Sequence, residues 1–185
     1  SLSSLLIGVT CTFVVMISLR GKAQLHRLWA FFNICVAIWG FGGFWITKCT
    51  DSILALFAWR IAHIGVIFIP ITFYHFICVF TKHKQKVILG FLYLFGLIFL
   101  YLDLFTPYLI PRVEYLFDSF YYAKSENNVI YFLLFIIWIS IVAAGHTLLL
   151  FHYKHTRSQI KKNKIKYFFV SVFTGFLGGV MNFFP

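Results

Sequence analysis

The stretch WRIAHIGVIFIPITFYHFICVF, residues Trp59–Phe80, belongs to an apolar run that begins at Ile53. A helix needs about 20 mostly apolar residues to cross the hydrocarbon layer of a membrane, and this run is longer. Because Pro70 lies inside the run, we expect one spanning helix that is tilted, or kinked at that proline. The stretch therefore predicts a helix that is solvated by lipid rather than by water.

Similar runs occur along the whole chain, so the sequence predicts one all-α domain, a polytopic transmembrane helix bundle with six spans. The predicted spans are residues 2–19, 28–47, 53–80, 87–105, 129–153 and 165–184.

The composition agrees with a membrane protein. Apolar residues make up 61% of the chain and charged residues only 11%, against about 25% in soluble domains. The net charge of +11 does not indicate nucleic-acid binding, because the chain has no separate basic domain. The four cysteines show no C-x-x-C spacing, and the histidines lack a metal-binding spacing, so neither a metal nor another cofactor is expected.

The loops between the predicted spans set the orientation. Cations gather in the first, third and fifth loops, as Arg20, Lys22 and Arg27; Lys82, Lys84 and Lys86; and Lys154, Arg157, Lys161, Lys162 and Lys164. The second and fourth loops carry no such excess. Since cytoplasmic loops are enriched in Lys and Arg, these three loops are predicted to be cytoplasmic, and the N-terminus to lie outside.

Two stretches carry a resemblance to a known family. They are residues 59–80 and KNKIKYFFVSVFTGFLGGVMNFFP, residues 162–185. The residues that carry it are Trp59, Arg60, His63, Ile64, Gly65, Pro70, His75 and Phe76, then Lys166, Tyr167, Gly175, Gly178, Gly179, Asn182 and Pro185. The chain resembles the seven-helix N-terminal sensor region of bacterial histidine kinases.

The resemblance implies a multi-pass sensor of a two-component system in the bacterial cytoplasmic membrane, whose seventh helix leads to a cytoplasmic kinase-type domain. We expect this chain to be a segment of a longer protein, truncated before that helix, and therefore not itself an enzyme. A homodimer is expected only through the parent protein.

Ionisable groups inside the membrane are costly and are functional candidates by default. Arg60 and His63 lie three residues apart on one helix face, and Asp103 is the one acidic residue within a predicted span. We predict that Arg60 and Asp103 approach each other in the outer half of the bundle, where Asn182 could join them in a ligand pocket. Alternatively, Arg60 reaches the lipid headgroups or only fixes helix packing, and Asp103 lies in interfacial water.

Two further histidines and a row of small residues complete the candidates. His75 and His146 lie at similar depth, and could form a proton-linked pair or simply hydrogen-bond within the helix packing. Gly175, Gly178 and Gly179 form a small face that, like Pro70, is assigned to helix packing, with glycines 40, 42 and 43 as its matching surface.

The fourth loop is rich in aromatic residues, which could form an interfacial belt or cap the mouth of the bundle. The basic fifth loop is expected to contact anionic lipids, with docking of a cytoplasmic domain as a second role.

The leading hypothesis is a receptor module that senses an external or membrane-dissolved small ligand and relays helix movement to a cytoplasmic kinase-type output domain. The alternative is a segment of a small-molecule or ion transporter. Against transport, the two halves of the chain show no inverted repeat.

Overall fold

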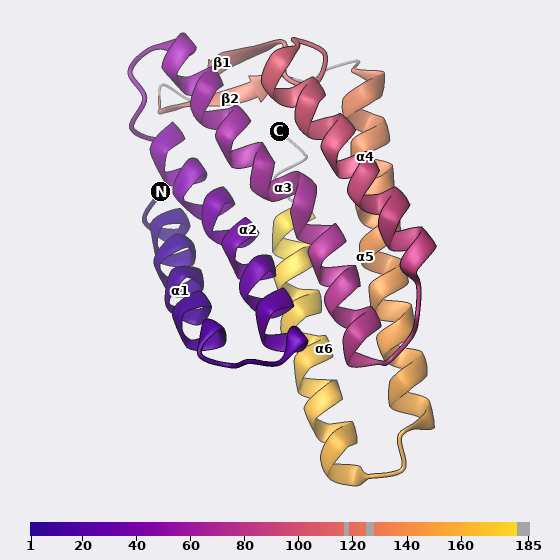
Figure 1. Ribbon diagram of the computed structural model, residues 1–185. Helices are drawn as coiled ribbons and strands as arrows, with labels where there is room; N and C mark the ends of the chain where they lie inside the picture. The colour runs from indigo at the N-terminus through magenta and orange to yellow at the C-terminus, as the bar shows by residue number, and fades with distance from the viewer. Residues whose placement is uncertain (117–118, 125–127, 181–185) are drawn as a thin grey trace.

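The computed structural model describes residues 1–116, 119–124 and 128–180. These residues form six α-helices and one two-stranded antiparallel sheet (Figure 1). The helices are α1 (Leu2–Leu19), α2 (Gln24–Ile46), α3 (Ser52–Phe80), α4 (Lys86–Phe105), α5 (Val129–His155) and α6 (Gln159–Val180). The strands are β1 (Arg112–Leu116) and β2 (Phe120–Lys124).

The predicted helical bundle is confirmed, and five of its helices, α1 to α5, are long and apolar enough to cross a membrane. Among the described residues α6, which begins at Gln159 rather than at the predicted Ile165, does not reach that level, because every 18-residue window that ends by Val180 includes lysines. Its first turns include Lys161, Lys162, Lys164 and Lys166. The predicted sixth span continues past Val180 into residues outside the described ranges.

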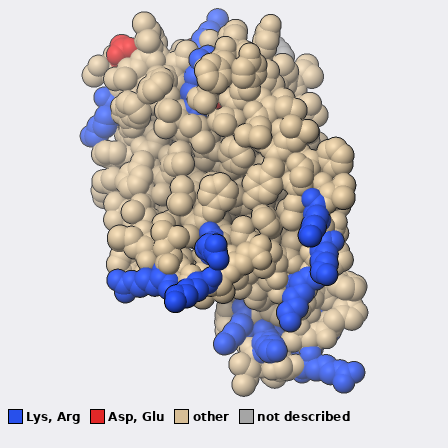
Figure 2. Space-filling model, in the orientation of Figure 1, with Lys and Arg blue, Asp and Glu red and all other residues tan. Residues whose placement is uncertain are grey.

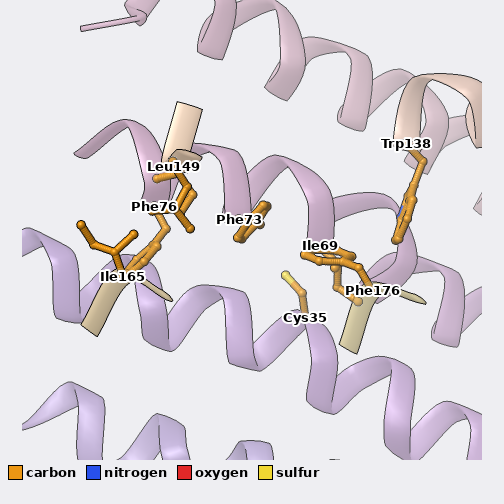
Figure 3. Packing of buried hydrophobic residues seen from close by; sticks show 9 residues of the cluster. Cys35, Ile69, Phe73, Phe76, Trp138, Leu149, Ile165 and Phe176 are labelled. Carbon is orange, nitrogen blue, oxygen red and sulfur yellow. The ribbon is translucent and has the colours of Figure 1, made fainter. Parts of the chain in front are cut away.

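Helix α3 is the centre of the bundle, and α2, α4 and α5 all pack against it (Figure 1). Its apolar side chains meet those of α2, α5 and α6 in one buried cluster, part of which Figure 3 shows. The buried members of this cluster are Cys35, Ile69, Phe73, Phe76, Ile77, Trp138, Leu149, Ile165 and Phe176. Helix α1 lies at the edge of the bundle and packs on α2.

The glycines of α2 and α3 allow these helices to approach closely. A Cβ added at Gly65 would lie 2.3 Å from the carbonyl oxygen of Cys35, and one at Gly42 would lie 2.5 Å from the Cβ of Ala62. A Cβ at Gly40 would meet the backbone of α1. The glycines of α2 therefore face α1 and α3, and the prediction that they match the small face of the sixth helix was wrong.

Most of the fourth loop is a β-hairpin, which the sequence analysis did not predict. The strands pair in the register Arg112↔Lys124 to Leu116↔Phe120. At its end, Asn128 donates a hydrogen bond from its side-chain amide to the carbonyl of Leu109, and its Oδ1 accepts hydrogen bonds from the first turn of α5. The loop is thereby tied to the start of α5.

Most of the Lys and Arg side chains seen in Figure 2 lie toward the end of the bundle opposite the hairpin, and a few lie at the hairpin end. The α1–α2, α3–α4 and α5–α6 connections all lie there, and the α5–α6 connection projects farthest (Figure 1). This is the arrangement on which the predicted orientation depends.

Candidate functional site

A buried pair of ionisable side chains joins α3 to α4. His63 Nδ1 lies 3.2 Å from Asp103 Oδ1, with 2% of the histidine and 0% of the aspartate side chain exposed. The second carboxylate oxygen of Asp103 is buried and has no hydrogen-bond partner among the described residues. A polar group that is removed from water is costly unless it has a partner, so this contact is a buried polar link between the two helices.

Arg60 lies next to this pair and does not contact the carboxylate. Its guanidinium donates hydrogen bonds to the carbonyls of Leu104, at 3.3 Å, and Thr106, at 3.2 Å. Arg60 and Asp103 therefore come to the same end of α4, but the side-chain contact of Asp103 is with His63. Arg60 instead satisfies the carbonyls that the last turn of α4 leaves unpaired, where the helix dipole favours a cation.

Aromatic rings surround His63. The ring of Tyr131 stacks on the imidazole at a centroid distance of 5.9 Å, and Trp59 meets it edge-on at 5.9 Å. The indole N–H of Trp59 donates to the carbonyl of Tyr121 at 3.0 Å, and its ring packs on Tyr122. The hairpin therefore covers one end of the site, which agrees with the interpretation of the loop aromatics as a cap.

His63 also lines a cavity of about 770 Å³, which we call the aromatic cavity. Its walls come from α1, α2, α3, α5 and α6. They are Ile7, Thr10, Cys11, Trp29, Phe32, Asn33, Val36, Trp39, Trp59, His63, Val66, Ile69, Tyr131, Trp138, Ser171, Val172, Thr174, Gly175, Phe176, Gly178 and Gly179. The volume is that of a small-molecule site, and an apolar lining with few polar groups is typical of such sites.

Pro70 shapes one wall of the aromatic cavity. It is fully buried inside α3, where its missing N–H leaves the carbonyl of Val66, four residues earlier, without the usual helical partner. The indole N–H of Trp138 on α5 donates to that carbonyl at 3.0 Å. The proline thus fixes a tryptophan of the neighbouring helix at the cavity wall.

The small face of α6 lines the aromatic cavity. A Cβ built at Gly175, Gly178 or Gly179 would meet no described atom within 4 Å, and the assignment of these glycines to helix packing stays a prediction. Ser171 and Thr174 line the cavity beside them. Asn182, predicted to join the ligand site, lies outside the described residues.

His75 and His146 have separate surroundings. His75 Nδ1 lies 3.0 Å from the hydroxyl of Tyr93 on α4, whereas His146 is surrounded by phenylalanines of α3 and α6, including Phe73 and Phe176. His146 Nδ1 lies 2.8 Å from the carbonyl of Val142 on its own helix. The structure records no contact between the two rings, so each packs within the bundle and they do not form the proton-linked pair.

The arrangement supports binding chemistry. With Nδ1 directed at Asp103, the other nitrogen of His63, Nε2, has no hydrogen-bond partner among the described residues and is available to a molecule in the cavity. Within the described ranges, no group of three His, Cys, Asp or Glu side chains could hold a metal ion.

The sequence analysis missed Tyr131 and Trp138 as parts of this site. An aromatic residue in an apolar helix carries no signal of its role. Pro70 did indicate that one carbonyl of α3 lacks its usual helical N–H partner, but the sequence does not show which side chain donates a hydrogen bond to that carbonyl.

Comparison with protein-family models, with curated proteins and with solved structures gives no match for this chain. The chemistry of the site is therefore the basis for the functional conclusion below.

Proposed function

We propose that this chain is the ligand-binding membrane module of a signal-transduction protein. It senses a small molecule in the aromatic cavity and relays helix movement to a cytoplasmic kinase-type output domain of the parent protein. In this proposal the module lies in the cytoplasmic membrane of a bacterium, with the N-terminus outside and the basic connections inside. Its partners are membrane lipids, the small ligand and a second copy of the parent protein.

The observation that carries the proposal is the aromatic cavity with one oriented polar group in its wall. Asp103 holds His63 by a contact of 3.2 Å between buried atoms, so the imidazole has little freedom to turn. A single fixed hydrogen-bonding group in an apolar cavity gives a ligand both affinity and orientation.

The position of α6 supports a role in signalling. Its backbone packs mainly against α5, while its aromatic side chains reach α2 and α3 across the bundle. Phe176, for example, contacts Phe73 at 4.9 Å between ring centroids and also lines the cavity. A ligand in the cavity would touch the same side chains that hold α6 in place. Occupancy would then favour one position of α6 over another, as a switch requires.

The proposal predicts that filling the cavity moves the cytoplasmic end of α6. Gly175→Phe adds a ring where a Cβ meets no described atom within 4 Å, so the substitution can mimic a ligand without a backbone clash. Spin labels on cysteines introduced at Lys84 and Ser158, both exposed, report the distance between the α3–α4 and α5–α6 connections. The native cysteines are replaced in this background. We expect the distance to change by about 2 Å, the scale of helix shifts in switching proteins.

Gly90→Phe is the matched control. Gly90 is an exposed glycine of α4 at which an added Cβ also meets nothing within 4 Å, and it does not line the cavity. The control should leave the distance unchanged. Ser171→Phe, which fills the same cavity, guards against a folding defect of the first variant. An unchanged distance in folded Gly175→Phe and Ser171→Phe proteins would overturn the proposal.

A further inference from the structure

The accessible side of the aromatic cavity lies between α1 and α6. Thr10 on α1 and Ser171, Thr174 and Gly175 on α6 are exposed, and all four line the cavity. Helix α1 packs on α2 and α6 on α5, and no comparable packing joins α1 to α6 among the described residues. Since Thr10 lies in the middle of an apolar helix of spanning length, this opening faces the hydrocarbon layer rather than water.

The opposite route, from the outer aqueous side, is covered. The hairpin lies over Trp59 through the hydrogen bond from its indole to Tyr121 and the ring contact with Tyr122. The hydroxyl of Tyr121 in turn donates to the carbonyl of Thr50, in the connection that precedes α3, at 3.4 Å. A ligand that dissolves in the bilayer therefore has a more open path than one that comes from water.

The lining of the cavity excludes charged ligands. Its described wall residues include no Lys, Arg, Asp or Glu, and they include four of the five tryptophans of the chain. The tryptophans Trp29 and Trp39 lie ten positions apart on α2, which corresponds to about 15 Å along the helix axis. The cavity thus suits an elongated apolar body.

The hydrogen-bonding chemistry of His63 determines which polar group a ligand in the cavity can carry. A hydroxyl can donate to Nε2 when the imidazole is neutral and accept from it when the imidazole is protonated, so it satisfies either state. A carboxylate would bring a second anion to a ring that already faces the buried carboxylate of Asp103. Two anions on one imidazole in a dry site repel each other.

We infer that the ligand is a neutral, lipid-soluble alcohol that enters the aromatic cavity from the bilayer between α1 and α6. Its hydroxyl hydrogen-bonds Nε2 of His63, and its apolar body lies along the tryptophans. This inference rests on the proposed function, because it takes the cavity to be the ligand site of the receptor.

Tryptophan fluorescence tests this inference, because bromine quenches indoles that it contacts and most indoles of this chain line the cavity. The full chain is placed in lipid vesicles and titrated with a long-chain alcohol that carries bromine on its chain. The alkane and the carboxylic acid of the same chain serve as comparison probes. We expect saturable quenching by the alcohol, with at least tenfold weaker binding of the alkane and the acid.

Four variants locate the binding. His63→Phe should weaken binding of the alcohol about tenfold, equivalent to about 1.4 kcal/mol, and leave the alkane unaffected. Gly175→Phe and Ser171→Phe should remove the saturable component, and Gly90→Phe should retain it. Equal binding of the three probes, or unchanged binding of the alcohol by folded His63→Phe protein, would overturn the inference.

The entry route has its own measurement. When the probe is supplied in preloaded vesicles, we expect Tyr122→Ala, which loosens the hairpin, to leave the rate of quenching unchanged. A faster rate in this variant would place the entrance under the hairpin and overturn the lateral route. Failure of the alcohol to bind, together with a shifted α6 in the cavity-filled variants, would refute the ligand class and leave the receptor proposal standing.

Discussion

Removal of either partner of the buried His63–Asp103 pair should destabilise the bundle more than removal of both. Asp103→Leu and His63→Phe each replace one polar side chain by an apolar one of comparable size. Each single variant leaves the remaining partner buried without its contact at 3.2 Å, because 2% or less of either side chain is exposed. The double variant Asp103→Leu/His63→Phe leaves neither group unpaired.

The burial of the pair sets the expected magnitude. An unsatisfied buried polar group costs about 1–3 kcal/mol, and breaking a buried ion pair on one side costs about 3–5 kcal/mol. We expect each single substitution to lower the free energy of unfolding by about 3 kcal/mol, and the double substitution to lower it by no more than either single one. The coupling energy between the two positions is then about 3 kcal/mol.

Reversible unfolding in mixed detergent micelles, followed by tryptophan fluorescence, measures these free energies. The matched control is the His75–Tyr93 hydrogen bond of 3.0 Å, which joins the same two helices but is only half-buried. For His75→Phe and Tyr93→Phe we expect a coupling of about 0.6 kcal/mol, the average for hydrogen bonds between membrane helices. A His63–Asp103 coupling no larger than this control would refute the argument that burial makes the pair strong.

Three further predictions use the same unfolding assay or NMR. Gly65→Ala should lower the free energy of unfolding by about 1–3 kcal/mol, because its Cβ would lie 2.3 Å from a carbonyl of α2, whereas Gly90→Ala should not lower it. Arg60→Ala should cost about 1–2 kcal/mol through the two carbonyls that it leaves unpaired, and Arg60→Lys should recover only part of this. The ammonium of Lys124 on β2 donates a hydrogen bond to Glu114 on β1 and holds the pKa of that carboxyl below its usual value. This contact therefore stabilises the hairpin above pH about 4.5, and the contribution is lost as the pH falls through the lowered pKa. The NMR signal of the Trp59 indole N–H should shift in that acidic range, and Glu114→Gln should remove the shift.

Much of the bundle could be predicted from the sequence, because hydropathy and length alone determine whether a helix can cross a membrane. The hairpin could not. Its aromatic residues, such as Tyr115 and Tyr121, face each other across the two strands, and the sequence offers no Asn-Gly or Asp-Gly turn to mark the pairing. The start of α6 was also missed, because lysines in the first turns conceal a helix from a search for apolar runs.

The residue that contacts Asp103 is determined by the relative heights of the side chains on α3 and α4 rather than by their charges. Charge complementarity favoured Arg60, which lies one turn nearer the start of α3 than His63. The long Arg60 side chain extends beyond Asp103 to the carbonyls of Leu104 and Thr106, while the shorter imidazole of His63 lies level with the carboxylate. The relative height of two helices depends on their packing, which no spacing along one chain reveals.

The glycines show the same limit on a larger scale. Gly65 on α3 and Gly175 on α6 both lie in rows of small residues, and sequence spacing gives each row the same meaning. A Cβ at Gly65 would meet the backbone of α2, whereas one at Gly175, which lines the aromatic cavity, would meet no described atom within 4 Å. A row of small residues permits the backbone of a neighbouring helix to approach closely, but it does not by itself place a helix there. When another helix packs against the row, as at Gly65, the row is a packing surface. When no described helix does, as at Gly175, the row leaves space that a ligand can fill.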